Sequence, residues 1–177
     1  MGYAVSWLAF QNQAEDEVLA LLGLQRTRET QEVPEGDWCI GRIGAWTIVW
    51  SNAYEPKSSR EVMSRFKGTF IICDIEEHVM FVSTACYDNG NRSWRIVHDA
   101  QKSPAHLVAE GDLPESFGRI KGEELARAGE SPDVDFNFEI PVRVAEEIIG
   151  FRHDSASPSV FEVLRPISAS KRKLWPF

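Results

Sequence analysis

The clearest hydrophobic pattern in the chain is the two-residue alternation that is typical of β-strands. Trp38 and Ile40 alternate with smaller or polar residues and are followed by a turn rich in glycine. Trp46 and Trp50 then share one face of the returning segment. We therefore predict a β-hairpin over residues 38–50, whose tryptophans pack in a core and do not form an exposed binding platform.

Similar patterns predict several more strands. Phe70–Cys73 is apolar on both faces and is therefore expected to be a central strand. Asp88-Asn89-Gly90 is a strong signal for a tight hairpin turn between two strands. The remaining strand candidates are Ala4–Phe10, Val79–Tyr87, Ser93–His98, His106–Glu110, Asp133–Ile140 and Val160–Leu164. The polar stretch at residues 26–35 carries no strand signal.

Helices are predicted where apolar residues recur at a spacing of three or four after a capping residue. The four candidates begin at Asn12, Ser58, Leu113 and Pro141, and end at Gly23, Gly68, Gly129 and Gly150. Strands joined mainly by hairpins, with helices between them, predict an α+β fold with a largely antiparallel sheet of about six to eight strands and three to four helices. We expect one domain over residues 1–165 and a flexible basic tail over residues 166–177.

Composition limits the class of protein. A chain of 177 residues with 43% hydrophobic residues can bury one core without disulfides or metals. It contains neither an apolar run of about 18 residues nor a secretory signal pattern, so we expect a cytoplasmic protein without a membrane-spanning segment. The three cysteines, Cys39, Cys73 and Cys86, lie in apolar stretches and are expected to be buried thiols.

The distribution of charge along the chain indicates which kinds of partner it would attract or repel. The net charge is −8, and the basic residues Lys171, Arg172 and Lys173 all lie in the tail, so the body of the protein is more acidic still. Such a body repels phosphate backbones and would attract a basic protein. We therefore expect no nucleic-acid binding and consider a basic protein as the partner. Candidate contacts are Glu76, Glu77, Asp135 and Glu139.

The candidate catalytic residues are two His-Asp pairs, His98-Asp99 and His153-Asp154. Histidine is the usual general base near neutral pH, and these four side chains could serve a small metal-dependent or acid/base hydrolase if the two pairs met in space. The sequence has no nucleophile elbow, phosphate-binding loop or closely spaced zinc ligands. We therefore expect no cofactor and no dedicated metal site.

Four segments, Ser6–Ala9, Val18–Leu24, His106–Pro114 and Phe136–Asp154, resemble a group of bacterial hypothetical proteins. The resemblance covers most of the chain and implies a bacterial cytosolic domain. It assigns no catalytic or binding residue, because no activity is established for that group.

Three classes of function remain open from the sequence. The preferred hypothesis is a non-enzymatic protein-binding domain, for instance an immunity-like protein that neutralises a basic partner. The alternative is the hydrolase built on the two His-Asp pairs, and a structural subunit of a larger assembly is the third class.

Overall fold

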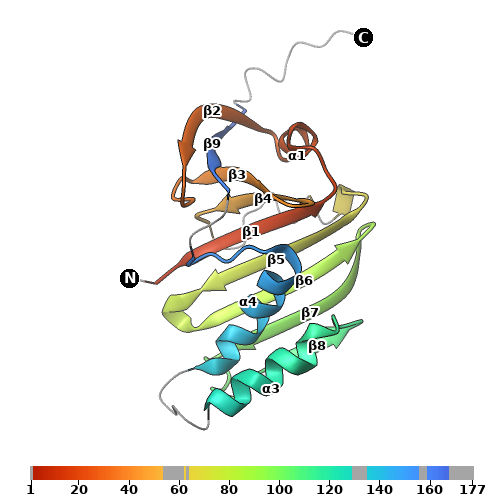
Figure 1. The fold of residues 1–177 in the computed structure, drawn as a ribbon, viewed down its shortest axis with the longest axis vertical. Coiled ribbons are helices and arrows are strands. Elements are labelled where there is room, and N and C mark those ends of the chain that lie inside the picture. Colours follow the sequence, from red (N-terminus) through yellow and green to blue (C-terminus); the bar gives the residue numbers. More distant parts are fainter. Residues whose placement is uncertain (1, 54–61, 63, 129–134, 156–158, 168–177) are drawn as a thin grey trace.

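The computed structural model describes residues 2–53, 62, 64–128, 135–155 and 159–167. Within these residues the chain forms a nine-stranded sheet and three α-helices (Figure 1). All neighbouring strands in the sheet are antiparallel. The predicted α+β class and antiparallel sheet are confirmed, although the sheet has more strands than expected.

The strand order in the sheet is β2-β9-β3-β4-β1-β5-β6-β7-β8, so β1 lies in the middle and β2 and β8 form the edges. The strands are β1 (Ala4–Gln11), β2 (Leu24–Gln31), β3 (Trp38–Ile43), β4 (Trp46–Ser51), β5 (Thr69–Glu76), β6 (Phe81–Asp88), β7 (Asn91–Asp99), β8 (Val108–Gly111) and β9 (Phe161–Pro166). A short 3-10 helix, η1 (Glu77–Val79), connects β5 to β6.

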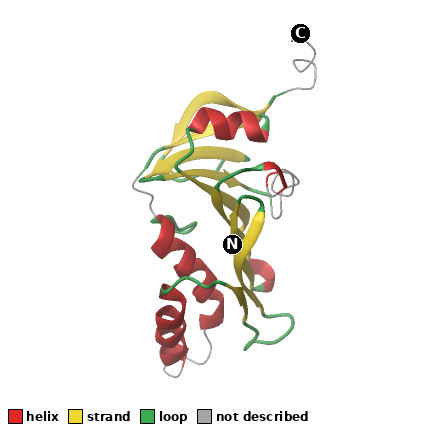
Figure 2. Cartoon of the chain, turned by 90° about the vertical axis from the view of Figure 1, so that its right-hand side faces the viewer, coloured by secondary structure: helices red, strands yellow, loops and turns green. Residues whose placement is uncertain are grey.

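The sheet has a hydrophobic core on each face. Alternating side chains of β1 show the division, because Trp7 belongs to one core and Leu8 and Phe10 to the other. Helices α3 (Ser116–Ala128) and α4 (Phe136–Ile149) lie together on the Trp7 face, as Figure 2 shows beside the lower half of the sheet. Helix α1 (Glu15–Leu22) covers the opposite face. None of the described helices is long and apolar enough to cross a membrane.

Both predicted hairpins are confirmed. Strands β3 and β4 pair over their whole length, and Trp46 and Trp50 are buried at 7% and 1% exposure. Asn89 and Gly90 adopt the positive φ angles of 50° and 83° that a tight turn between β6 and β7 requires. Phe70 is fully buried in β5, next to the central strand, as its two apolar faces predicted.

The predicted strand at Asp133–Ile140 is wrong in its described part, because α4 begins at Phe136 and continues to Ile149. Phe136, Ile140 and Val144 follow one another at a spacing of four, so the same residues satisfy both a strand and a helix pattern. Pro141 was expected to start the helix but lies inside it. Its carbonyl oxygen accepts a hydrogen bond of 3.0 Å from the hydroxyl of Thr84 in β6, which ties α4 to the sheet.

Two further predictions need correction. The polar stretch without a strand signal contains β2, an edge strand with an irregular register against β9 between Arg26 and Thr30. Helix α1 is capped at Ala14 and not at Asn12, whose positive φ of 55° places it in the preceding turn. The predicted helix start at residues 58–61, the stop at Gly129 and most of the predicted tail lie outside the described residues.

All three cysteines are free thiols and buried, as predicted. Burial raises the pKa of Cys73 to about 12, although a hydrogen bond from Thr84 opposes this shift. Burial likewise raises the pKa of Cys86 to about 11 and, above all other effects, raises that of Cys39. Thiolates are the reactive form of cysteine, so burial and the raised pKa both disfavour reaction of these thiols near neutral pH.

We expect the free energy of unfolding to fall as the pH rises above about 9, where a cysteine thiol ordinarily ionises. In that range the unfolded chain loses thiol protons while the folded chain keeps the proton of Cys73 up to about pH 12. The folded state then binds more protons, so its stability decreases with pH. Denaturant titrations at several pH values should show a shallower decrease in Cys73→Ala, by at most about 1.4 kcal/mol per pH unit. Identical slopes in both proteins would contradict this assignment.

Candidate functional site

His98 is completely buried near the end of β7, where both ring nitrogens face oxygen atoms. Nδ1 lies 2.6 Å from the carbonyl oxygen of His106, and Nε2 lies 2.8 Å from Oδ2 of Asp135. A carbonyl oxygen only accepts hydrogen bonds, so Nδ1 must carry a hydrogen atom. The ring therefore has no nitrogen left to act on a substrate.

Asp135 connects His98 to the start of α4. Its Oδ1 accepts a hydrogen bond of 3.3 Å from the backbone N–H of Phe138, which makes Asp135 the N-cap of the helix. Its second oxygen binds His98, as described above. Asp135 was a candidate contact for a basic partner, but its side chain, only 18% exposed, holds α4 against the sheet.

His153 makes a second buried contact, in the loop that follows the C-terminal end of α4. It is 2% exposed, and its Nε2 lies 3.1 Å from Oε1 of Glu77 in η1. The other carboxylate oxygen of Glu77 accepts a hydrogen bond of 2.8 Å from the backbone N–H of Tyr3. The ring of Tyr3 also packs edge-on against His153, with ring centres 5.1 Å apart. Glu77 thus joins the start of β1 to the loop after α4.

Arg152 organises the charges in that loop. Its guanidinium donates hydrogen bonds of 2.5 Å to Asp154 and 2.9 Å to Glu139, and its side chain is 16% exposed. Burial opposes ionisation of Asp154, but the hydrogen bond from Arg152 and the charge of His153 together lower the pKa of Asp154 below its usual value. Glu139 and Asp154 are therefore each paired with Arg152 within the fold, and the role of Arg152 was not foreseen from the sequence.

The two His-Asp pairs do not share an interaction among the described atoms. Asp99 is paired with Lys102 at 3.6 Å, and His98 is paired with Asp135. In the second pair, Asp154 binds Arg152 and His153 binds Glu77. Glu76 is 2.7 Å from Nδ1 of its neighbour His78. In the described part of the chain, no three His, Cys, Asp or Glu side chains are grouped so that they could hold a metal ion. This geometry favours structural roles for both buried histidines.

A different group of acidic residues faces solvent around the end of edge strand β2. We call Glu29, Glu32, Glu35 and Asp37 the acidic edge; all four are exposed. Within the described residues, none of their carboxylates has a basic side chain within ion-pair distance. Arg28 is the single basic residue between positions 27 and 37. Val33, 40% exposed, adds an apolar side chain in the middle of the acidic edge.

Hydrogen bonds hold the acidic edge in one conformation. Oε1 of Gln31 accepts from the backbone N–H groups of Glu35 and Gly36 at 3.0 and 3.2 Å. The side chain of Asn52 donates to the carbonyl oxygen of Glu35 at 2.6 Å, and its backbone N–H donates to that of Asp37 at 3.2 Å. These hydrogen bonds restrain the loop at residues 35–37, which reduces the entropy that a partner's binding there would cost.

The acidic edge also affects a buried group. Burial is the main reason why the pKa of Cys39 is raised, and the negative charges of Glu29 and Asp37 raise it further. The acidic edge thus adds to the effect of burial on Cys39, the second residue of the neighbouring strand β3. The sequence already showed the four acids in one short segment, but without a strand signal for residues 24–31 it did not place them at a sheet edge.

Comparisons with known proteins add no assignment: no protein-family model, no curated protein and no solved structure matches the chain.

Proposed function

We propose that this chain is a non-enzymatic binding protein that contacts a basic protein through the acidic edge. The observation that carries the proposal is the set of four exposed carboxylates that have no basic partner among the described residues. Opposite charges across an interface accelerate encounter and select the partner, and the net charge of −8 acts in the same direction.

The position of the acidic edge supports this role. Among the described strands, β2 pairs only with β9, so on this part of the chain its outer backbone is available to a partner. Val33 supplies an apolar contact among the charges, which resembles the apolar centre and polar surround of protein interfaces. One form of such a protein is an immunity-like protein, which would neutralise a basic toxin in the bacterial cytoplasm by covering its active site.

The test is capture of partners from the native host by tagged protein and by two charge-reversal variants. Glu32→Lys/Glu35→Lys reverses two charges of the acidic edge. Asp112→Lys/Glu115→Lys makes the same change of net charge at exposed positions between β8 and α3. We expect the unmodified protein and the second variant to retain one basic protein in stoichiometric amount. The first variant should retain at least about tenfold less.

Two results would contradict the proposal. One is the absence of any stoichiometric basic protein in captures at low salt. The other is an equal loss in both variants, because net charge alone would then explain the binding. A captured basic protein should also dissociate more readily as salt is added, since exposed charge pairs are screened.

A further inference from the structure

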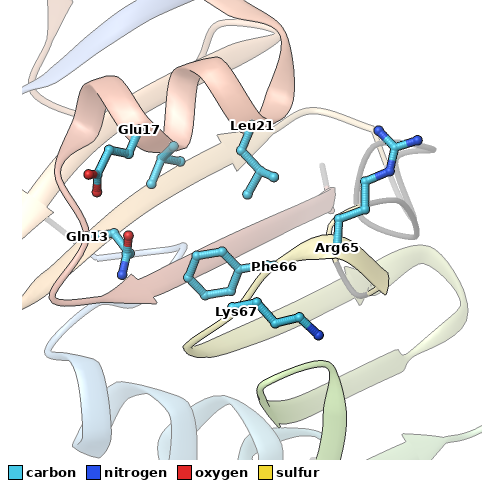
Figure 3. A pocket seen from close by; sticks show the side chains of 7 residues that line it. Gln13, Glu17, Leu21, Arg65, Phe66 and Lys67 are labelled. Carbon is cyan, nitrogen blue, oxygen red and sulfur yellow. The ribbon is translucent and has the colours of Figure 1, made fainter.

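A pocket of about 300 Å³ lies between α1 and the segment that leads into β5. Figure 3 shows Leu21 reaching from α1 towards the ring of Phe66, with Arg65 and Lys67 at one end of the pocket and Gln13 and Glu17 at the other. The volume is at the lower end of the range for small-ligand sites, about 300–1,000 Å³. The pocket is separate from the acidic edge, which lies at the end of β2 and on the β2–β3 connection.

The apolar part of this pocket is fixed by the core beneath it. Val18 is 1% exposed and Phe66 8% exposed. The ring of Phe66 packs edge-on against Phe10 and Phe70, with ring centres 5.1 and 5.7 Å apart. An apolar ligand would therefore meet a surface that is already formed, and little ordering of side chains would oppose its binding.

The charges around the pocket are unequally distributed. Lys67 is exposed, and among the described residues no carboxylate lies within ion-pair distance of its amino group. Arg65 also lines this end of the pocket, but Figure 3 shows its guanidinium turned away from the amino group of Lys67, so Lys67 is the cation that faces an incoming anion here. Glu17 is at the other end, where its carboxylate accepts a hydrogen bond of 3.4 Å from the backbone N–H of Ala14. One end of the pocket is thus suited to an anion, on a protein that is acidic overall.

We propose that this pocket binds a small amphipathic carboxylate, such as an aromatic or branched aliphatic acid. The apolar part of the ligand contacts Leu21 and Phe66, and its carboxylate lies near Lys67. A hydrophobic floor with a few placed polar groups is the usual composition of a small-molecule site. The inference is independent of the basic protein partner, because it uses neither the acidic edge nor β2.

The test is an NMR titration of the whole protein with phenylacetate and with its neutral analogue 2-phenylethanol. We expect saturable shifts of the backbone amide signals of Leu21 and Phe66 with phenylacetate, and weaker binding of the alcohol. Lys67→Glu should weaken phenylacetate binding about tenfold. Lys121→Glu makes the same charge change on an exposed residue of α3 and should leave the affinity unchanged. Leu21→Trp should fill the pocket and abolish saturation.

Circular dichroism and the NMR spectra of the free variants establish that each is folded before it is titrated. The proposal is overturned if phenylacetate causes no saturable shifts at the pocket. It is also overturned if the alcohol binds equally well, or if Lys67→Glu and Lys121→Glu have the same affinity for phenylacetate.

Discussion

Glu124→Ala is expected to lower the free energy of unfolding by about 1.5–3 kcal/mol, because the hydrogen bonds that its buried carboxylate accepts from two arginines are lost. The side chain of Glu124 is completely buried in α3. Its carboxylate accepts hydrogen bonds of 2.9 and 3.0 Å from Arg127 and another from Arg143 of α4. Glu124 thus joins the two helices that cover the Trp7 face of the sheet.

Denaturant unfolding measures this effect, and Glu123→Ala is the matched control. Glu123 is the neighbouring residue and also pairs with Arg143, at 2.7 Å, but its side chain is 41% exposed. Exposed ion pairs contribute little, because water screens the charges. The loss for Glu123→Ala should therefore be much smaller than for Glu124→Ala. Equal losses would show that burial does not determine the role of Glu124.

Asp135→Ala is also expected to lower the free energy of unfolding by about 3 kcal/mol, because two interactions are lost together. Loss of the N-cap of α4 costs about 1 kcal/mol. Removing the partner of a buried ring costs about 1–3 kcal/mol more, since His98 has no access to water.

Asp135→Ser separates these two contributions. Serine is a good N-cap residue, but its side chain is too short to reach both Phe138 N–H and the His98 ring as the aspartate does. Unfolding in denaturant should therefore place Asp135→Ser between the unmodified protein and Asp135→Ala. If the serine variant matches the unmodified protein, the contact with His98 contributes nothing to stability, and the structural role assigned to this histidine is wrong.

The parts of the fold that the sequence predicts correctly are those with local signals. The turn at Asn89-Gly90 needs residues that tolerate positive φ, and the hairpin of Trp46 and Trp50 needs alternation in one short segment. Helix α4 was partly misassigned because Phe136, Phe138 and Ile140 alternate as in a strand. All three are buried, because this part of α4 packs against both the sheet and α3 and therefore needs no polar face there.

Strand β2 was missed for the opposite reason. It is an edge strand in which only Leu24 is buried, so tertiary pairing with β9 and not apolar alternation determines its structure. The two buried histidines show the same limit. His98 meets Asp135, and His153 meets Glu77, across 37 and 76 residues of chain. Nothing in the local sequence distinguishes these structural ties from a shared catalytic site.

The position of β9 in the sheet also determines the order in which the protein can be completed during synthesis. Strand β9 lies between β2 and β3, but Phe161 follows Gln31 by 130 residues. At a translation rate of about 5–20 residues per second, β2 waits roughly 7–26 s for β9, its one neighbour among the described strands. During that time β3 is paired with β4 on one side only. Its other side, where Cys39 and Ile40 later pair with β9, has no partner strand. The nascent chain is therefore open to pairing with other chains before the finished protein is formed.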